Sequence, residues 1–132
     1  MVIGCGTDIV ETERFKNAVR RWEQSFLERV FTAREIAYAM RRRFYQEHLA
    51  ARFAAKEAVF KAFGDGFSRI NFKDVEIIND ENGRPRVLLY GVLEQLRRSR
   101  QVSSILISLS HSRAYAQAMA LLISDGTHAA KT

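Results

Sequence analysis

The fold of this chain is decided by residues 52–66, which read Arg52-Phe53-Ala54-Ala55-Lys56-Glu57-Ala58-Val59-Phe60-Lys61-Ala62-Phe63-Gly64-Asp65-Gly66. At helical spacing, one stripe carries small apolar side chains, those of Ala51, Ala55, Ala58, Val59 and Ala62. The opposite side carries Phe53, Glu57, Phe60, Lys61 and Gly64. A helix that is apolar on two sides is usually buried, so we expect a central helix over residues 46–63.

Glu57 is placed by this pattern among phenyl rings, which predicts a buried carboxylate. Burying a carboxylate is unfavourable unless it is paired or bound to a cation. Lys61 lies one turn further on and offers an i,i+4 ion pair, whereas a bound cation is the alternative partner. The helix pattern alone leaves both partners open.

The sequence Gly64-Asp65-Gly66 ends the helix and leaves a stretch of backbone with little side-chain bulk. A phosphate or another ligand can approach such a backbone closely. Because an acid, a base and a glycine loop lie together, residues 57–66 form a candidate ligand site.

Composition predicts one globular domain over residues 1–124 and a polar tail over residues 125–132, since 47% of the 132 residues are hydrophobic and 27% are charged. No apolar run reaches the roughly 18 residues of a membrane span. The first eight residues lack the basic segment of a signal peptide, so we expect a cytoplasmic protein that does not contact a membrane. The single cysteine, Cys5, lies in an apolar run and predicts a small buried thiol.

The order of the elements predicts an α+β fold in which helices pack on an antiparallel sheet. Capping-box patterns start at Ser25 and at Thr32, and the second one opens a helix that reaches Phe44. The first helix carries an expected inner stripe of Phe15, Ala18, Val19, Trp22 and Phe26. Strands are expected over residues 2–8, 75–78, 86–89, 104–110 and 115–123, and a short helix follows Gly91.

Asp8 and the arginines of the first helix each allow a structural and a functional interpretation. Asp8 follows a strand, where an aspartate commonly caps the next helix. Arg14 and Arg21 lie on the outer side of that helix, and most such rows are simply solvated surface. The net charge of +6 nevertheless predicts attraction to an acidic partner, a nucleic acid or a phosphorylated small molecule.

Three segments of the chain carry a family resemblance. They are Gly6-Thr7-Asp8-Ile9-Val10-Glu11, then Arg52 to Ala58 with Lys61, Gly64 and Gly66, and finally Ser108-Leu109-Ser110-His111-Ser112 with Tyr115-Ala116. Their order and spacing resemble the holo-acyl-carrier-protein synthases, the small phosphopantetheinyl transferases. One departure is Asp65, an acid between the two loop glycines, where a small neutral residue is expected.

The resemblance implies an activity and a set of site residues. The implied reaction transfers the phosphopantetheine arm of coenzyme A to a serine of an acyl carrier protein, releases an adenosine bisphosphate and supplies the holo carrier for fatty acid synthesis. Asp8 and Glu57 are implied to hold Mg²⁺. The implied coenzyme A contacts are Arg52, Lys61 and His111 for phosphates, Gly64 and Gly66 for backbone access, and Pro85 and Ser112 near the nucleotide.

The same resemblance implies a homotrimer with its active sites between subunits, and a docking role for Arg14 and Arg21 toward the acidic carrier protein. Two other classes of function compete with it. A nucleic-acid-binding module fits the charge but leaves Asp8 and Glu57 unexplained, because carboxylates repel a phosphate backbone. A magnesium-dependent nuclease or phosphohydrolase uses similar residues and predicts hydrolysis of coenzyme A without any carrier protein.

Overall fold

A computed structural model describes residues 1–64 and 71–125 of the chain. Its elements, in order, are β1 (Val2–Glu11), α1 (Thr12–Val30), α2 (Ala33–Met40), α3 (Tyr45–Phe63), the 3-10 turn η1 (Phe72–Asp74), β2 (Val75–Asn79), β3 (Pro85–Leu89), α4 (Gly91–Ser99), β4 (Ser104–His111) and β5 (Tyr115–Ile123). Asp65 and Gly66, two residues of the expected glycine loop, lie outside the described residues.

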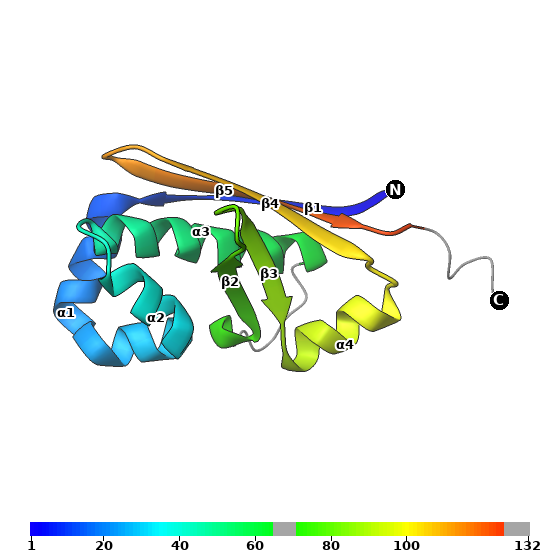
Figure 1. Cartoon of the computed structure of the whole chain (residues 1–132), viewed down its shortest axis with the longest axis horizontal. Helices are drawn as coiled ribbons and strands as arrows, with labels where there is room; N and C mark the ends of the chain where they lie inside the picture. The colour runs from blue at the N-terminus through cyan, green and yellow to red at the C-terminus, as the bar shows by residue number, and fades with distance from the viewer. Residues whose placement is uncertain (65–70, 126–132) are drawn as a thin grey trace.

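The strands form two antiparallel sheets, and α3 lies beneath the larger one (Figure 1). The larger sheet has the order β1-β5-β4, which places β1 at an edge with β5 as its neighbour. The hairpin β2–β3 crosses in front of α3 (Figure 1). Helices α1 and α2 cover the N-terminal half of α3. Helices packed on an antiparallel sheet confirm the predicted α+β class.

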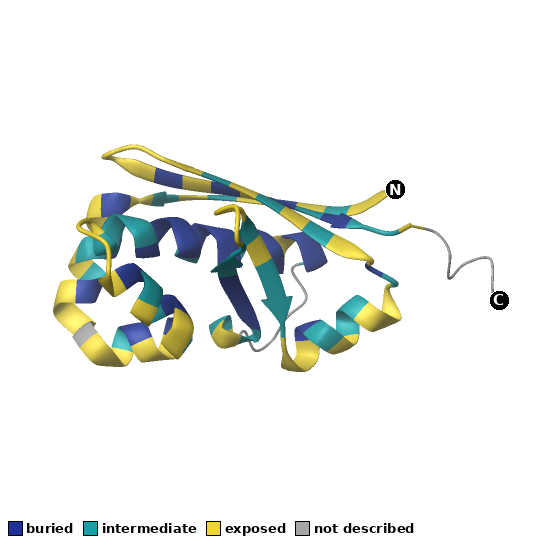
Figure 2. Cartoon of the chain, in the orientation of Figure 1, coloured by how far each residue is buried: buried dark blue, intermediate teal, exposed yellow. Residues whose placement is uncertain are grey.

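Helix α3 is buried along most of its length, as its two apolar sides predicted (Figure 2). Toward the sheet, Ala58 and Val59 pack in a core that includes Ala118 and Leu122 of β5. Toward α1 and α2, a second core gathers around Phe15, Val19, Leu27, Phe31, Leu49 and Ala50. The helix therefore organises both cores, and its position fixes every side chain that it carries.

Two glycines bring β1 unusually close to α3. A Cβ atom placed on Gly6 would lie 2.0 Å from the carbonyl oxygen of Ala58, and one on Gly4 would lie 2.5 Å from that of Ala62. Strand and helix therefore approach backbone to backbone. Since side chains alternate along a strand, Cys5 between them points to the other face of the sheet, where it is exposed. The prediction of a buried thiol was wrong for this reason.

A buried ion pair joins α3 to α2. The Nζ atom of Lys56 lies 2.7 Å from Oε1 of Glu35, and both side chains are fully buried. Lys56 also donates to the carbonyl oxygens of Phe72, at 3.0 Å, and Val75, while Glu35 accepts a hydrogen bond from the backbone N–H of Ile77. These bonds connect α2, α3, η1 and β2 at one point.

Several local predictions are corrected by the structure. Thr32 does cap α2 with Glu35 in a capping box, but α2 ends at Met40 instead of Phe44. Ser25 lies inside the continuous helix α1, where its hydroxyl donates to the carbonyl of Trp22, so the first capping-box prediction was wrong. Trp22 itself is 54% exposed instead of belonging to the inner stripe. Because α1 begins at Thr12, Asp8 is a strand residue and does not cap it.

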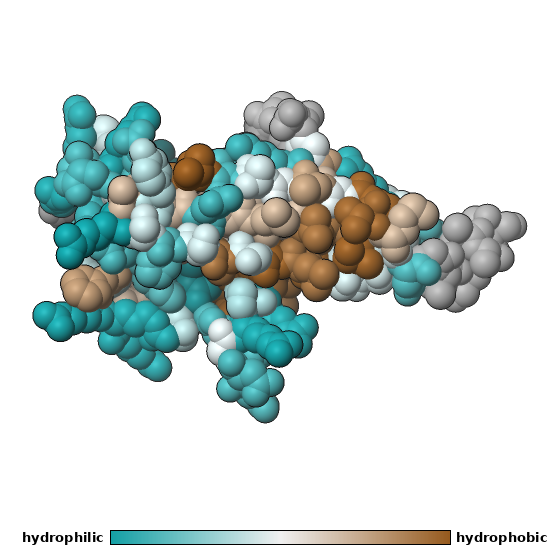
Figure 3. Space-filling view, turned by 90° about the horizontal axis from the view of Figure 1, so that it is seen from above, coloured by the Kyte–Doolittle hydropathy of each residue, from teal (hydrophilic) through white to brown (hydrophobic). Residues whose placement is uncertain are grey.

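The outer face of the larger sheet is exposed and largely apolar. Val2, Ile3, Ile9, Leu106 and Met119 are among its exposed large side chains. Figure 3 looks onto this face from above and shows a band of hydrophobic atoms across it. Within the described residues, no helix combines the length and apolar composition needed to cross a membrane.

Candidate active site

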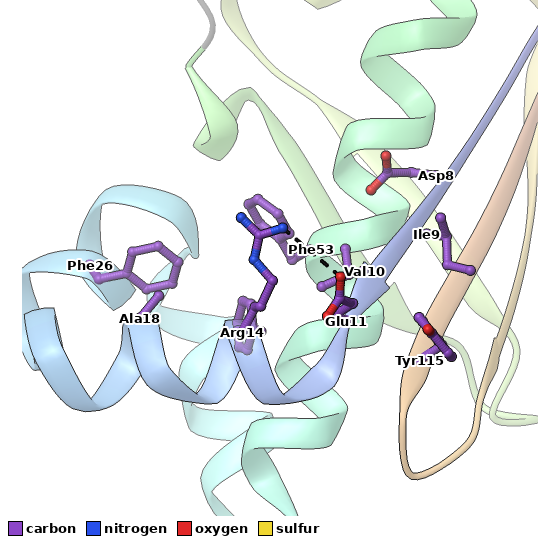
Figure 4. A pocket seen from close by; sticks show the side chains of 10 residues that line it. Asp8, Ile9, Val10, Glu11, Arg14, Ala18, Phe26, Phe53 and Tyr115 are labelled. Atoms are coloured by element: carbon purple, nitrogen blue, oxygen red, sulfur yellow. Dashed lines mark ion pairs between the residues drawn. The ribbon is translucent and has the colours of Figure 1, made fainter.

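The close contact between β1 and α3 brings two acids and a lysine together. Asp8 projects from β1 toward α3 (Figure 4). The Nζ atom of Lys61 donates to Oδ1 of Asp8 at 2.9 Å and to the carbonyl oxygen of Thr7 at 3.2 Å. Glu57 lies one helical turn before Lys61 on α3. We call Asp8, Glu57 and Lys61 the β1–α3 cluster.

Electrostatics within this cluster disfavour the charged form of Glu57. Burial raises the pKa of its carboxyl group, the negative charge of Asp8 raises it further, and the ammonium of Lys61 lowers it. Glu57 is only partly buried, whereas the sequence predicted a buried carboxylate. Lys61 forms an ion pair with Asp8, with 2.9 Å between Nζ and Oδ1. Two neighbouring carboxylates therefore share one positive side chain, and additional positive charge would stabilise both.

The donor set of the cluster fits a magnesium ion. Asp8 and Glu57 offer carboxylate oxygens, the ligands that Mg²⁺ prefers, and this ion often uses one or two carboxylates together with waters and substrate phosphates. In the described part of the chain, no group of three or more histidine, cysteine, aspartate or glutamate side chains could hold a metal ion. The cluster therefore suits an ion whose other ligands come from water and substrate.

A hollow of about 440 Å³ opens beside Asp8 and runs along α1 (Figure 4). Its walls include Glu11, Arg14, Phe53 and Tyr115. A second hollow, of about 380 Å³, shares the walls Ala18, Phe26 and Phe53 and continues to Trp22, Arg29 and Phe72. The sequence did not single out Glu11, Phe53 or Tyr115 as site residues. The two hollows give the acidic cluster a long neighbouring groove with aromatic walls.

Arginines border this groove on α1. Arg14 lines the hollow beside Asp8, and its guanidinium lies 4.0 Å from the carboxylate of Glu11, with most of the side chain in solvent (Figure 4). Arg21 lies over the ring of Trp22, 5.3 Å from its centroid. The groove therefore offers exposed positive charge next to apolar surface, which suits an acidic partner with an apolar contact.

Arg52 lies on another side of α3 and is almost fully buried. Its Nε donates to Nε2 of His48 at 2.9 Å, its Nη1 donates to the carbonyl of Ile77 at 2.7 Å, and its Nη2 donates to Oδ1 of Asn79. Burial, followed by the positive charges of Arg52 and Arg42, lowers the pKa of His48 to about 4. The imidazole is therefore neutral at neutral pH and can accept the hydrogen bond from Arg52.

A separate hollow of about 340 Å³ lies between the β2–β3 hairpin and β4. Arg52, Pro85 and His111 line it together with His48 and Asn79. We call Arg52, Pro85 and His111 the hairpin cluster. Ser112 follows directly after β4, where its hydroxyl accepts the backbone N–H of Tyr115 at 3.3 Å.

Gly64 ends α3 with φ at +118°, a conformation that favours glycine. Its N–H donates to the carbonyls of Phe60 and Lys61, and a Cβ atom on it would meet no described atom within 4 Å. Among the described residues, nothing hinders approach to the backbone at Gly64. Gly66 lies outside the described residues.

The predicted site residues fall into two clusters that do not share a hollow. The hollow that includes Asp8 and the hollow that includes Arg52 and His111 have no residue in common. Because Arg52 and Glu57 are five residues apart, they point about 140° apart around the axis of α3. Within one chain, the structure therefore joins Asp8 to Lys61 and Arg52 to the hairpin, and keeps these two sets on different sides of the helix.

Comparison with known proteins gives one consistent result. Residues 4–120 match the 4'-phosphopantetheinyl transferase superfamily. A holo-[acyl-carrier-protein] synthase from Protochlamydia amoebophila is 48% identical over 122 residues, which cover 92% of this chain and 98% of the relative.

Solved structures agree in fold. The holo-[acyl-carrier-protein] synthase of Neisseria meningitidis has a TM-score of 0.85 at 29% identity, covering 94% of this chain and 100% of that one. The holo-(acyl-carrier-protein) synthase of Bacillus anthracis in complex with CoA (3',5'-ADP) has a TM-score of 0.77 at 32% identity, covering 95% of this chain and 99% of that one. The chain therefore belongs to the 4'-phosphopantetheinyl transferase superfamily and, within it, to the holo-[acyl-carrier-protein] synthases.

Proposed function

We propose that this protein transfers the phosphopantetheine arm of coenzyme A to a serine of an apo acyl carrier protein in the cytoplasm. The reaction depends on Mg²⁺, releases adenosine 3',5'-bisphosphate and gives the holo carrier for fatty acid synthesis. The observation that carries this proposal is the β1–α3 cluster, where Asp8 lines a groove bordered by Arg14 and lies close enough to Glu57 to raise the pKa of its carboxyl group. The coenzyme A complex of the Bacillus anthracis relative supports the choice of donor.

Asp8 and Glu57 hold the metal ion in this proposal. Held by these two carboxylates, a magnesium ion would polarise the phosphoryl group and offset the charge that develops on the leaving phosphate. Lys61 contacts the phosphates of coenzyme A, and the backbone at Gly64, where a Cβ atom would meet no described atom within 4 Å, leaves room for them. Gly66 is assigned the same role from its place in the sequence motif. The serine proton passes to Glu57 or to a water that Asp8 orients, because a general base must reach the proton directly or through one water.

The hairpin cluster binds the nucleotide end of coenzyme A in this proposal. Arg52 and His111 supply positive charge and hydrogen-bond donors toward phosphate, and Pro85 and Ser112 lie near the nucleotide. The bonds of Arg52 to Ile77 and Asn79 also hold the hairpin in place. Arg52 therefore supports the wall of the hollow as well as lining it.

The test of the function is the intact mass of an apo acyl carrier protein incubated with this protein, coenzyme A and Mg²⁺, with and without a chelator. We expect a gain of one phosphopantetheine group that disappears with chelator. Coenzyme A that is hydrolysed without modification of the carrier would instead indicate a phosphohydrolase. An unmodified carrier with intact coenzyme A would contradict the proposed transfer to that carrier.

Arg14 and Arg21 dock the acidic carrier protein in this proposal, and a charge reversal tests the docking. Arg14→Glu is expected to lower kcat/KM for the carrier about tenfold, because opposite charges speed encounter, and the loss should shrink at high salt. The affinity for coenzyme A should stay nearly unchanged. Steady-state kinetics at two salt concentrations measure the first effect and calorimetry the second. Arg98→Glu on α4 is the matched control. Equal losses toward both substrates would place docking elsewhere.

We propose further that the protein is a homotrimer in which the site lies between neighbouring subunits. Two observations support this. Asp8 of the β1–α3 cluster and the hairpin cluster line different hollows, so a ligand that needs both clusters would be served by two chains. The larger sheet also exposes a band of apolar side chains (Figure 3), and other copies of this chain would cover it.

Complementation between two inactive variants tests the shared site. Glu57→Gln changes the β1–α3 cluster and His111→Glu changes the hairpin cluster, so each variant alone should be nearly inactive. Co-expressed chains should regain part of the activity, because some interfaces then combine two unaltered clusters. Light scattering of the same samples reports the oligomeric state. A trimer without recovered activity would mean that each site lies within one subunit.

A further inference from the structure

The ammonium of Lys61 occupies a position beside Asp8 that offers cation-binding oxygens. It donates to Oδ1 of Asp8 at 2.9 Å and to the carbonyl oxygen of Thr7 at 3.2 Å. Asp8 is mostly buried, with 16% of its side chain exposed, whereas Lys61 is 48% exposed and reaches Asp8 from the helix. Asp8 is thus the more buried partner of this pair. Lys61 is the more mobile partner, because its side chain is longer.

Without additional positive charge, the two carboxylates of the cluster would repel each other. Asp8 lies close enough to Glu57 to disfavour its ionisation, and Lys61 opposes that effect. The lysine therefore acts as a counterion that belongs to the protein itself. A divalent cation bound to Asp8 would repel an ammonium at the same carboxylate, because two like charges a few ångströms apart interact unfavourably.

We propose that Lys61 is a built-in substitute for the metal ion: its ammonium neutralises Asp8 in the free enzyme and must leave when a divalent cation binds. This inference rests on the proposed metal role of Asp8 and Glu57. It predicts that the free enzyme binds the cation weakly, since binding requires that the Lys61–Asp8 pair be broken.

Coenzyme A changes this balance because its pyrophosphate offers the displaced ammonium a new partner. Metal and coenzyme A should then bind cooperatively, each strengthening the other by the same factor, as thermodynamic linkage requires. Lys61 adds its own share to this coupling, beyond what shared phosphate ligands of the ion contribute. The Lys61 side chain is about half exposed, which gives its ammonium room to move.

The test measures binding of Mn²⁺, a paramagnetic probe for the magnesium site, by electron paramagnetic resonance with and without coenzyme A. Lys61→Met removes the ammonium and keeps an unbranched side chain that is one heavy atom shorter. In the absence of coenzyme A, this variant should bind Mn²⁺ about tenfold more tightly than the unaltered protein. The tightening caused by coenzyme A should remain in the variant, where substrate phosphates still offer ligands to the ion, but it should be about tenfold smaller than in the unaltered protein.

Lys73→Met is the matched control, because it removes the same charge from an exposed lysine of η1. This variant should leave the affinity for Mn²⁺ unchanged, both with and without coenzyme A. The comparison separates displacement of the Lys61 ammonium from a general effect of net charge. Equal coupling in Lys61→Met and the unaltered protein, with Mn²⁺ bound in both, would overturn the role of Lys61 and leave the proposed function intact. If the unaltered protein bound no Mn²⁺ even with coenzyme A, the metal site and this inference would both fail.

Discussion

Glu57→Gln is expected to lower the rate of phosphopantetheine transfer by at least about a hundredfold while the fold stays intact. The amide has the size of the carboxylate but lacks its negative charge, so it binds a divalent cation poorly and cannot accept the serine proton. Glu57 is partly buried and takes no part in either hydrophobic core, so the change should not disturb packing. Single-turnover mass spectrometry of the carrier protein measures the rate.

A second glutamate of the same helix provides the control for this variant. Glu47 lies in the first turn of α3 and pairs with Lys16 at 3.4 Å, away from the β1–α3 cluster. Glu47→Gln should therefore retain nearly full activity. Thermal unfolding of both variants reports whether the fold is kept. A Glu57→Gln protein with a normal rate at saturating Mg²⁺ would exclude Glu57 as a metal ligand and as the base.

Lys56→Met should have the largest effect on stability, lowering the free energy of unfolding by about 3–5 kcal/mol. The change leaves the carboxylate of Glu35 buried without its ion-pair partner. It also removes the donor to the carbonyls of Phe72 and Val75. Urea unfolding at a fixed protein concentration, followed by circular dichroism, measures the change.

The double variant Lys56→Met, Glu35→Gln separates the charge from the packing. It removes the buried carboxylate, and the single glutamine oxygen can keep one of the two bonds that Glu35 accepts from the N–H groups of Ile77 and Thr32. We expect it to recover a large part of the lost stability, because replacing both partners of a buried pair is often close to neutral. Lys16→Met, in a partly exposed pair, should lose no more than about 1 kcal/mol. If the single and double variants were equally unstable, the lost carbonyl bonds would be the cause.

The central helix could be predicted from sequence because its signal is local and repeated. Two apolar sides over 19 residues leave little alternative to burial, and the observed α3 begins one residue before the expected start. The burial of this helix also indicates that Lys56 has a partner, because a buried lysine is unfavourable without one. The identity of that partner, Glu35, comes from a separate helix and is not encoded locally.

The arrangement of the site was harder to predict because it depends on contacts between distant segments. The sequence named both Asp8 and Glu57, but only the close approach at Gly6 explains why they meet. It did not reveal that Arg52 and His111 line a different hollow, since no local pattern reports how a hairpin crosses a helix. The exposure of Cys5 has the same origin, because the glycines beside it decide which face of β1 meets α3.

The pairing of β1 with β5 has a consequence for the protein as it is made on the ribosome. Asp8 lies opposite Ala118 in this ladder. Strand β1 therefore cannot pair with β5 until about 100 further residues have been synthesised. At roughly 5–20 residues per second, this delay lasts on the order of 5–20 s. A nascent chain that stops before β5 therefore carries both carboxylates without the sheet that fixes their spacing. The spacing of Asp8 and Glu57 is therefore fixed only when β5 is in place, which ties the proposed activity to nearly full translation of the domain.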